Sequence, residues 1–113
     1  MVIFKIISIL LNLICILSGW ITLIKNPGII YNDNNEENNE PKIYCFQCRF
    51  RYPHLKQQIT HCDKCGVCCF GRDHHWDVFG KCVAKDNLII FVTFTISICI
   101  LLLFNFISII FII

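Results

Sequence analysis

The residues in this chain that are best suited to chemistry are cysteines and histidines concentrated in its middle. Seven of the nine cysteines and all four histidines lie between positions 45 and 82. The spacing reads Cys45-x2-Cys48-x12-His61-Cys62-x2-Cys65-x2-Cys68-Cys69-x3-Asp73-His74-His75-x6-Cys82. Zinc prefers thiolate and imidazole ligands, and a Cys-x-x-Cys turn presents two thiolates to one ion. Two such pairs with interleaved histidines therefore predict a metal-binding domain.

Three other interpretations account for less of this stretch. A RING-type ubiquitin ligase needs a Cys-x-His step after the first long gap, whereas His61 and Cys62 are adjacent here. A four-cysteine ribbon leaves the histidines unexplained. A cysteine-rich loop without metal has too few aliphatic side chains to form a core, whereas a metal-binding free energy of about 10 kcal/mol can hold such a loop together.

The elements that position this stretch are two apolar segments at the ends of the chain. Residues 2–24 carry one charge, Lys5, and residues 88–113 carry none. Each is long enough to cross about 30 Å of hydrocarbon as a helix, and neither has the polar face of a surface helix. We predict an α-helical membrane protein in which two transmembrane helices flank a small, irregular, cytosolic two-zinc domain. A cleaved signal peptide at 2–24 is a poorer fit, because the apolar run is too long and lacks a clear small-x-small cleavage site.

The basic residues predict the orientation. Nine of the ten lysines and arginines lie between the two apolar segments, and cytosolic loops carry such an excess. In the reducing cytosol, clustered cysteines favour metal over disulfides. Cys15 and Cys99 lie inside the apolar segments, where a thiol is a small apolar side chain. The net charge of +2 is too small and too scattered to predict nucleic-acid binding.

The chain between the helices divides into a linker at 25–41 and a metal domain at 42–87. Pro27 and Gly28 end the first helix. The run from Asn32 to Asn39 contains only Asn, Asp and Glu, so we expect a partly disordered linker. Asp86 or Asn87 is expected to cap the second helix by accepting a hydrogen bond from a free backbone N–H group.

The stretch from Cys45 to Phe91 resembles the cysteine-rich domain of the DHHC family of protein S-acyltransferases (palmitoyltransferases). The family pattern ends in Asp-His-His-Cys, five residues, Cys, four residues, Asn, three residues and Phe. The matching positions are Cys45, Cys48, His61, Cys62, Cys65, Cys68, Asp73, His74, His75, Cys82, Asn87 and Phe91. The gap before His61 is longer than in the family, and Trp76 stands where the family has its nucleophilic cysteine. Residues 26–28 also resemble the family's Asp-Pro-Gly motif.

The resemblance implies two structural zinc ions with interleaved ligands. The first set is Cys45, Cys48, His61 and Cys68. The second set is Cys62, Cys65, His75 and Cys82. Four protein ligands at each ion suit a structural rather than a catalytic metal.

The resemblance also implies a two-step acyl transfer from palmitoyl-CoA, or another long-chain acyl-CoA, to a cysteine of a membrane-associated protein. His74 would be the general base, and Asp73 would orient its imidazole. Trp76 cannot form a thioester, so we expect a protein S-palmitoyltransferase that is impaired at this step. The alternative is a non-catalytic, zinc-stabilised membrane scaffold or an accessory subunit of a complete transferase.

Cys69 has no role in the implied scheme. It is a spare thiol, a ligand in an alternative register, or a substitute nucleophile. Because Cys and Trp codons can differ by one base, an error in the sequence or a decaying gene is a further explanation of Trp76.

The implied partners are membrane lipid, membrane-associated protein substrates with cysteines, and other transferase chains. The resemblance covers one helix, the metal domain and one helix, whereas family members usually carry further membrane helices. Two helices alone enclose little volume for a long acyl chain, unless chains associate. The expected location is an endomembrane (ER or Golgi) or the plasma membrane, with both termini on the far side from the cytosol.

Overall fold

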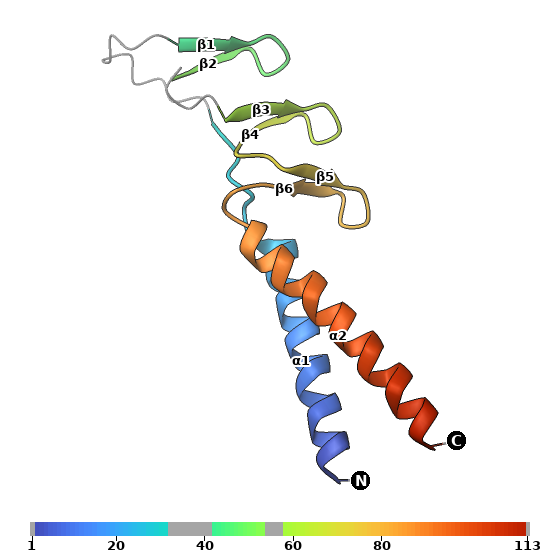
Figure 1. The fold of residues 1–113 in the computed structure, drawn as a ribbon. Coiled ribbons are helices and arrows are strands. Elements are labelled where there is room, and N and C mark those ends of the chain that lie inside the picture. The colour runs from blue at the N-terminus through green and yellow to red at the C-terminus, as the bar shows by residue number, and fades with distance from the viewer. Residues whose placement is uncertain (1, 32–41, 54–57, 113) are drawn as a thin grey trace. The chain divides into compact units, whose positions relative to one another are not determined.

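The computed structural model describes residues 2–31, 42–53 and 58–112 of the chain (Figure 1). The disorder expected for the run at 32–39 lies outside the described residues. The chain forms two compact units, one of residues 1–25 with 89–113 and the other of residues 26–88. The predicted fold class is confirmed, because two apolar helices flank a small domain rich in cysteine and histidine. The finer division of the chain at residues 25–41 and 42–87 stays a prediction.

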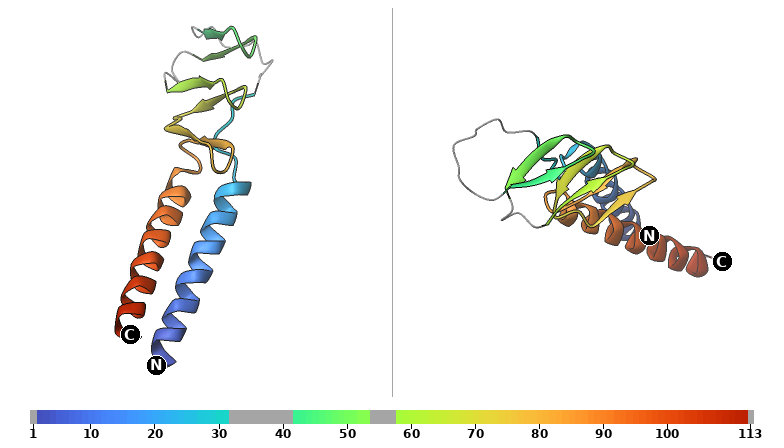
Figure 2. Two further views of the ribbon diagram at one scale, coloured as in Figure 1. Left: turned by 90° about the vertical axis from the view of Figure 1, so that its right-hand side faces the viewer. Right: turned by 90° about the horizontal axis from the view of Figure 1, so that it is seen from above.

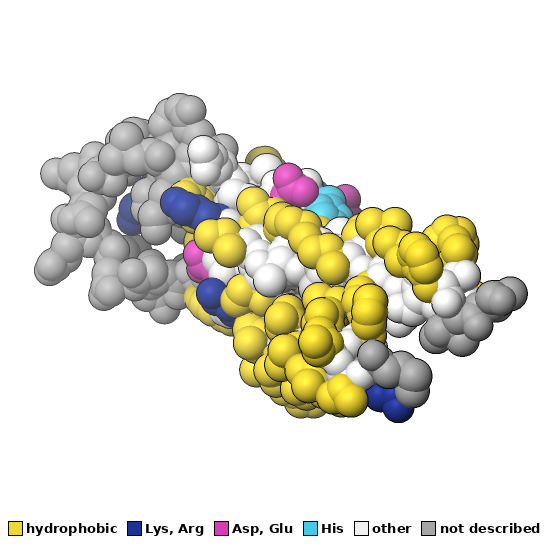
Figure 3. Space-filling view, turned by 60° about the horizontal axis from the view of Figure 1, so that its bottom comes forward, with side chains coloured by type: hydrophobic (Ala, Val, Ile, Leu, Met, Phe, Trp, Pro, Cys, Tyr) yellow, Lys and Arg dark blue, Asp and Glu magenta, His cyan; other side chains and the backbone are white. Residues whose placement is uncertain are grey.

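The helical unit contains α1 (Val2–Ile24) and α2 (Leu88–Ile112). Both are long and apolar enough to cross a membrane, with mean hydropathies of 2.3 and 2.6. Figure 3 shows hydrophobic side chains over most of the helical surface that faces the viewer. An exposed apolar surface of this kind suits a lipid environment, whereas on a soluble protein it would be a liability.

Small side chains line the contact between the two helices. Ser18, Gly19 and Thr22 are buried in α1, and a Cβ on Gly19 would lie 2.7 Å from the Phe94 ring of α2. The Thr22 hydroxyl donates to the Ser18 carbonyl at 2.7 Å, so its polar group is satisfied within α1. Small residues let membrane helices approach closely, and here the space beside Gly19 is filled by an aromatic ring.

The second unit is built from three antiparallel hairpins in chain order (Figure 1). The strands are β1 (Lys42–Cys45) with β2 (Phe50–Pro53), β3 (Ile59–Cys62) with β4 (Val67–Phe70), and β5 (His74–Trp76) with β6 (Lys81–Val83). Strands of different hairpins make few contacts with one another. A two-stranded hairpin alone is marginally stable in water, so the hairpins need a further link.

The segment that follows α1 pairs with β4 through backbone hydrogen bonds. The sequence analysis did not predict this pairing. The Asn26 side chain accepts hydrogen bonds from the backbone N–H groups of Gly28 and Ile29, both at 2.9 Å. Gly28 has φ of +104°, and its carbonyl accepts from the Phe70 N–H at 2.9 Å. The N–H of the next residue but one, Ile30, donates to β4 as well. This turn therefore joins the N-terminal segment of the unit to its middle hairpin.

The prediction that Asn87 caps α2 is wrong. Its carboxamide oxygen accepts from the Ala84 N–H at 2.8 Å, and its NH2 group donates to the Cys82 carbonyl at 3.1 Å. Asn87 is fully buried, so these backbone groups depend on it for hydrogen bonding. The side chain faces back along the chain and ties the end of β6 to the start of α2.

Candidate metal centres and catalytic pair

The first ligand cluster joins the turn of the first hairpin to the two strands of the second. Cys45 ends β1 and Cys48 lies in the turn that follows it. His61 of β3 and Cys68 of β4 are direct cross-strand partners. His61 Nδ1 lies 3.2 Å from the Cys48 Sγ and 3.7 Å from the Cys68 Sγ. The Sγ atoms of Cys48 and Cys68 are 3.5 Å apart.

The second cluster repeats this plan one hairpin later. Cys62 ends β3 and Cys65 lies in the turn that follows it. His75 of β5 pairs with Cys82 of β6. His75 Nδ1 lies 3.6 Å from the Cys62 Sγ and 3.2 Å from the Cys65 Sγ. The Sγ atoms of Cys65 and Cys82 are 3.5 Å apart.

Both clusters have the dimensions of a closed tetrahedral metal site. All four ligand atoms in each lie within 4.8 Å of one another. Zinc–sulfur and zinc–nitrogen bonds at tetrahedral angles would place two sulfurs about 3.8 Å apart and a sulfur and nitrogen about 3.6 Å apart. The observed spacings of 3.2–3.7 Å match these values. Each cluster could therefore hold one metal ion, and no ligand position is left open for chemistry.

The electrostatics of the clusters also favour a cation. The pKa values of Cys68 and Cys82 are raised above the usual cysteine value. Burial is the larger cause, and hydrogen bonding to neighbouring thiols is the second. Several thiolates at this separation repel one another in the absence of a positive charge. A bound metal ion removes that penalty and favours the deprotonated ligands.

The sequence analysis missed two carboxylates behind the histidine ligands. The outer nitrogen Nε2 of His61 lies 3.7 Å from Asp63, and the Nε2 of His75 lies 3.6 Å from Asp77. Carboxylates in this position orient a ligand imidazole and increase its basicity. A repeated His-x-Asp at 61–63 and 75–77 is the signal that could have identified them.

The interleaved ligand sets link the hairpins in series. The first cluster connects the β1–β2 hairpin to β3–β4, and the second connects β3–β4 to β5–β6. Figure 2 shows the three hairpins following one another through the unit. Two metal ions at these clusters would provide the link that the hairpins lack.

The predicted catalytic residues Asp73 and His74 form a hydrogen-bonded pair at the start of β5. The Nδ1 of His74 donates to the Asp73 carboxylate at 2.8 Å. The backbone of Asp73 is held by a 2.9 Å hydrogen bond to the Val83 carbonyl, and the His74 side chain is 39% exposed. The pair has the geometry of a general base oriented by a carboxylate.

Trp76 ends the strand that carries this pair. Its ring packs against Phe79, with 4.1 Å between centroids. A tryptophan side chain has no thiol, so residue 76 offers no nucleophile beside His74. The position predicted for the nucleophile therefore carries an aromatic side chain of the β5–β6 hairpin.

Cys69 is not placed to replace the missing thiol. It is fully buried in β4 and packs with Cys62 and Cys82. Burial raises the pKa of the Cys69 thiol, which disfavours the nucleophilic thiolate. Cys69 also lies outside both ligand clusters. The structure therefore supports the spare-thiol interpretation over a substitute nucleophile or an alternative ligand.

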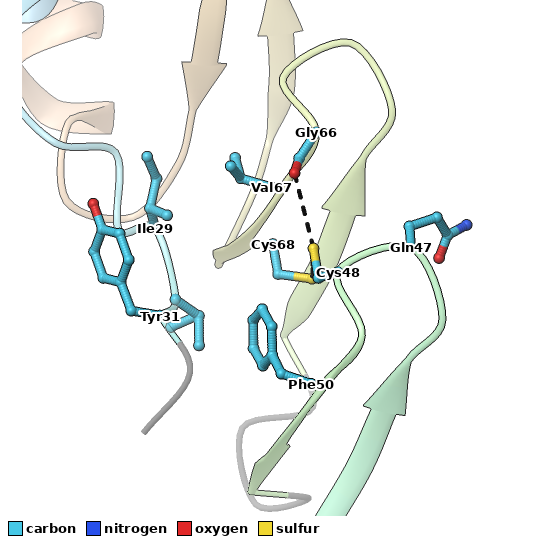
Figure 4. Close-up of a pocket in the computed structure, with 9 residues that line it drawn as sticks. Ile29, Tyr31, Gln47, Cys48, Phe50, Gly66, Val67 and Cys68 are labelled. Carbon is cyan, nitrogen blue, oxygen red and sulfur yellow. Dashed lines mark hydrogen bonds between the residues drawn. The ribbon is translucent and has the colours of Figure 1, made fainter. Parts of the chain in front are cut away.

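A cavity of about 360 Å³ lies beside the first cluster (Figure 4). Cys48 and Cys68 line it from one side and the Ile29–Tyr31 segment from another, with the Phe50 ring between them. The Cys48 thiol lies 3.9 Å from the Gly66 carbonyl. Neither Asp73 nor His74 is among the residues that line this cavity, so it does not form part of the predicted catalytic site.

Comparison with known proteins identifies the family. The family model described as DHHC palmitoyltransferase matches residues 37–113. Probable palmitoyltransferase ZDHHC24 of Rattus norvegicus is 41% identical over 44 residues, which cover 39% of this chain and 14% of the relative. Palmitoyltransferase ZDHHC18-B of Danio rerio is 41% identical over 64 residues, 56% of this chain and 16% of the relative.

Palmitoyltransferase ZDHHC14 of Homo sapiens is 39% identical over 64 residues, 56% of this chain and 12% of the relative. The chain thus spans about one-seventh of the length of the curated relatives it matches. The matched region contains both ligand clusters and the Asp73–His74 pair. The chain belongs to the DHHC palmitoyltransferase family.

Proposed function

We propose that this chain acts in protein S-acylation, with palmitoyl-CoA or another long-chain acyl-CoA as donor and a cysteine of a membrane-associated protein as acceptor. The observation that carries the proposal is the 2.8 Å hydrogen bond between Asp73 and His74. The next residue, His75, belongs to the second ligand cluster. The Asp73–His74 pair is therefore adjacent in sequence to the proposed second metal site. The names of the relatives support the same reaction class.

In this proposal His74 is the general base. Its Nε2 accepts the proton of an attacking thiol, and Asp73 holds the opposite nitrogen protonated and stabilises the imidazolium that results. The resulting thiolate attacks the thioester carbonyl of the acyl-CoA, and CoA leaves as its thiol. Two zinc ions, one in each cluster, supply only structural stability, because both ligand sets are complete.

Trp76 impairs the first half of this reaction. An acyl-enzyme requires a thiol next to the base, and residue 76 offers an indole ring instead. Cys69, the nearest thiol in the sequence that is not a proposed ligand, is fully buried. The chain as it stands therefore retains the base and its scaffold but not the nucleophile.

The domain is proposed to face the cytosol, with α1 and α2 crossing an endomembrane or the plasma membrane. The excess of lysine and arginine between the helices supports this orientation. The proposed partners are membrane lipid, acyl-CoA, cysteine-containing membrane-associated proteins and other transferase chains.

The test restores the missing thiol. The chain is purified in detergent with zinc and incubated with labelled palmitoyl-CoA as wild type, as Trp76→Cys and as the thiol-free control Trp76→Ser. We expect hydroxylamine-sensitive label on Trp76→Cys alone, and loss of that label when His74→Ala is added. Metal content is measured for every variant, so that a folding defect is recognised.

Two results would contradict the proposal. Label on the wild type that survives Cys69→Ala would show that residue 76 is not the limiting position. Absence of label on Trp76→Cys with two zinc ions bound would argue against acyl transfer and favour the non-catalytic scaffold.

A further inference from the structure

An ion pair connects the turn of the second hairpin to the turn of the third, beside the second ligand cluster. The Lys64 ammonium group donates to Asp77 Oδ1 at 2.5 Å. The same Oδ1 atom lies 3.6 Å from Nε2 of His75, whose Nδ1 faces the sulfurs of the cluster. We call Lys64 and Asp77 the ionic clasp. Through the His75 imidazole, the clasp is in contact with the proposed second metal site.

The second cluster carries surplus negative charge even when a divalent ion is bound. Its ligands are three cysteines and one histidine, so three thiolates against one divalent cation leave a net charge of −1. The Asp77 carboxylate adds a further negative charge close to this site, and like charges at such a distance repel one another. Lys64 supplies the compensating positive charge. The lysine therefore favours a position of the carboxylate beside His75 that repulsion from the cluster would oppose.

The first cluster has the same kind of carboxylate but not the lysine. Asp63 lies 3.7 Å from the Nε2 of His61. The residue that corresponds to Lys64, the third of the Cys-x-x-Cys stretch, is Gln47, whose side chain is neutral. Among the residues that the structure describes, Asp63 forms no ion pair with a lysine or an arginine. The two clusters thus differ in the charge that holds the outer carboxylate.

Both members of the clasp are exposed, so their mutual attraction adds little to the stability of the fold. The side chains of Lys64 and Asp77 are 61% and 72% exposed, and pairs of this kind are screened by water and salt. A carboxylate beside a ligand imidazole has a larger effect on the metal site, because it orients the ring and increases the basicity of the ligand. The effect of the clasp is therefore expected in metal retention rather than in unfolding.

We propose that Lys64 is a positioning residue for the second metal site: it holds the Asp77 carboxylate beside His75 and thereby slows the loss of the metal ion. The first site, which has Asp63 but no lysine, releases its ion sooner. This inference concerns metal retention, so it does not depend on acyl transfer and is tested separately from it.

Site-resolved alkylation tests the proposal in the full chain, purified in detergent and loaded with zinc. Excess chelator removes the metal, pulses of N-ethylmaleimide label each thiol as it becomes free, and mass spectrometry gives the rate at each cysteine. Cys48 reports on the first site and Cys65 on the second, because both are half-buried and each is the second cysteine of its pair. Labelling of the metal-free chain corrects for the intrinsic reactivity of each thiol, and metal analysis before chelation gives the starting content.

The variants change the charge at the two corresponding turn positions. They are Lys64→Met, the conservative Lys64→Arg, the gain-of-charge variant Gln47→Lys, and a charge-swapped pair that combines Lys64→Asp with Asp77→Lys. The swapped pair restores an ion pair between the two turns but places an ammonium group, which cannot accept a hydrogen bond, beside the His75 ring. It therefore separates positioning of the imidazole from a simple link between hairpins.

We expect Cys65 to be labelled more slowly than Cys48 in the wild type. Lys64→Met should accelerate labelling at Cys65 about fivefold, the upper end of what one exposed ion pair contributes, and leave Cys48 unchanged. Lys64→Arg should keep the wild-type rate. Molar salt should accelerate labelling at Cys65 in the wild type but not in Lys64→Met. Gln47→Lys should slow labelling at Cys48.

Three results would overturn the proposal. Equal rates at Cys65 in the wild type and in Lys64→Met would show that the lysine does not affect metal retention. A wild-type rate in the charge-swapped pair would show that the clasp only links two hairpins. An unchanged rate at Cys48 in Gln47→Lys would show that the charge at this turn position does not cause the difference between the two sites.

Discussion

Replacing either of two neighbouring buried cysteines with alanine should separate metal ligation from core packing. Cys82 and Cys69 are 1% and 0% exposed, and both belong to one buried cluster. Only Cys82 belongs to a ligand cluster, with its Sγ 3.5 Å from that of Cys65. The substitutions Cys82→Ala and Cys69→Ala thus remove the same atom from similar surroundings.

The expected magnitudes differ greatly. Removing one buried sulfur from a packed site costs about 1 kcal/mol in lost transfer free energy, plus a small cavity term. A structural zinc site contributes roughly 10–16 kcal/mol, and a site with three of its four ligands loses much of that affinity. Because the strands of different hairpins contact one another little, loss of the second ion should also release the β5–β6 hairpin.

The assay is elemental analysis of each purified variant, followed by limited proteolysis. We expect two zinc ions in the wild type and in Cys69→Ala, and one in Cys82→Ala. Proteases should cut Cys82→Ala first between residues 70 and 87. Two ions in Cys82→Ala, or one in Cys69→Ala, would refute the assignment of ligands.

Three further predictions concern the rest of the metal domain and its connection to the membrane. Asn87→Ala leaves the Ala84 N–H and the Cys82 carbonyl without their hydrogen-bond partner, so it should destabilise the domain by about 2–4 kcal/mol. The control is Asp86→Ala, at an exposed neighbour. Equal thermal unfolding midpoints for the two variants would contradict this prediction. Gly28→Ala places a Cβ on a residue with φ of +104° and should cost about 1–2 kcal/mol, seen as a lower midpoint of metal release on heating. Removal of both metal ions with a chelator should make the hairpins protease-sensitive while the helical circular-dichroism signal persists; retained resistance of residues 42–87 would show that the metal is dispensable.

The metal clusters illustrate how far local spacing determines a site. Each Cys-x-x-Cys pair spans the end of a strand and the turn that follows it, so its two thiols converge through local geometry that the spacing predicts. His61 and Cys68 are seven residues apart, and they meet because the register of β3 with β4 makes them cross-strand partners. The residue spacing alone left open which histidine and which third cysteine complete each site, and the family resemblance supplied the assignment.

The roles of Cys69, Asn87 and residues 28–30 were beyond the reach of the sequence because each depends on non-local contacts. In the sequence Cys69 was a candidate nucleophile, but in the structure its side chain on β4 is buried in the core. Asn87 looked like a helix cap, but buried backbone groups at residues 82 and 84 require its amide. Residues 28–30 form backbone hydrogen bonds with β4, which lies some forty residues further along the chain.

The local sequence was enough to predict the two membrane-length helices, the ligand types and the adjacent Asp73 and His74. The length of an apolar segment, the spacing of ligands around a turn and the adjacency of two residues depend only on positions close together in the chain, so they can be predicted directly from the sequence. The folded structure was needed to see that the ligand clusters link the hairpins in series, that Cys69 is buried, and that Trp76 stacks on Phe79. Those features arise from strand register and packing between segments distant in the chain, which no local pattern encodes.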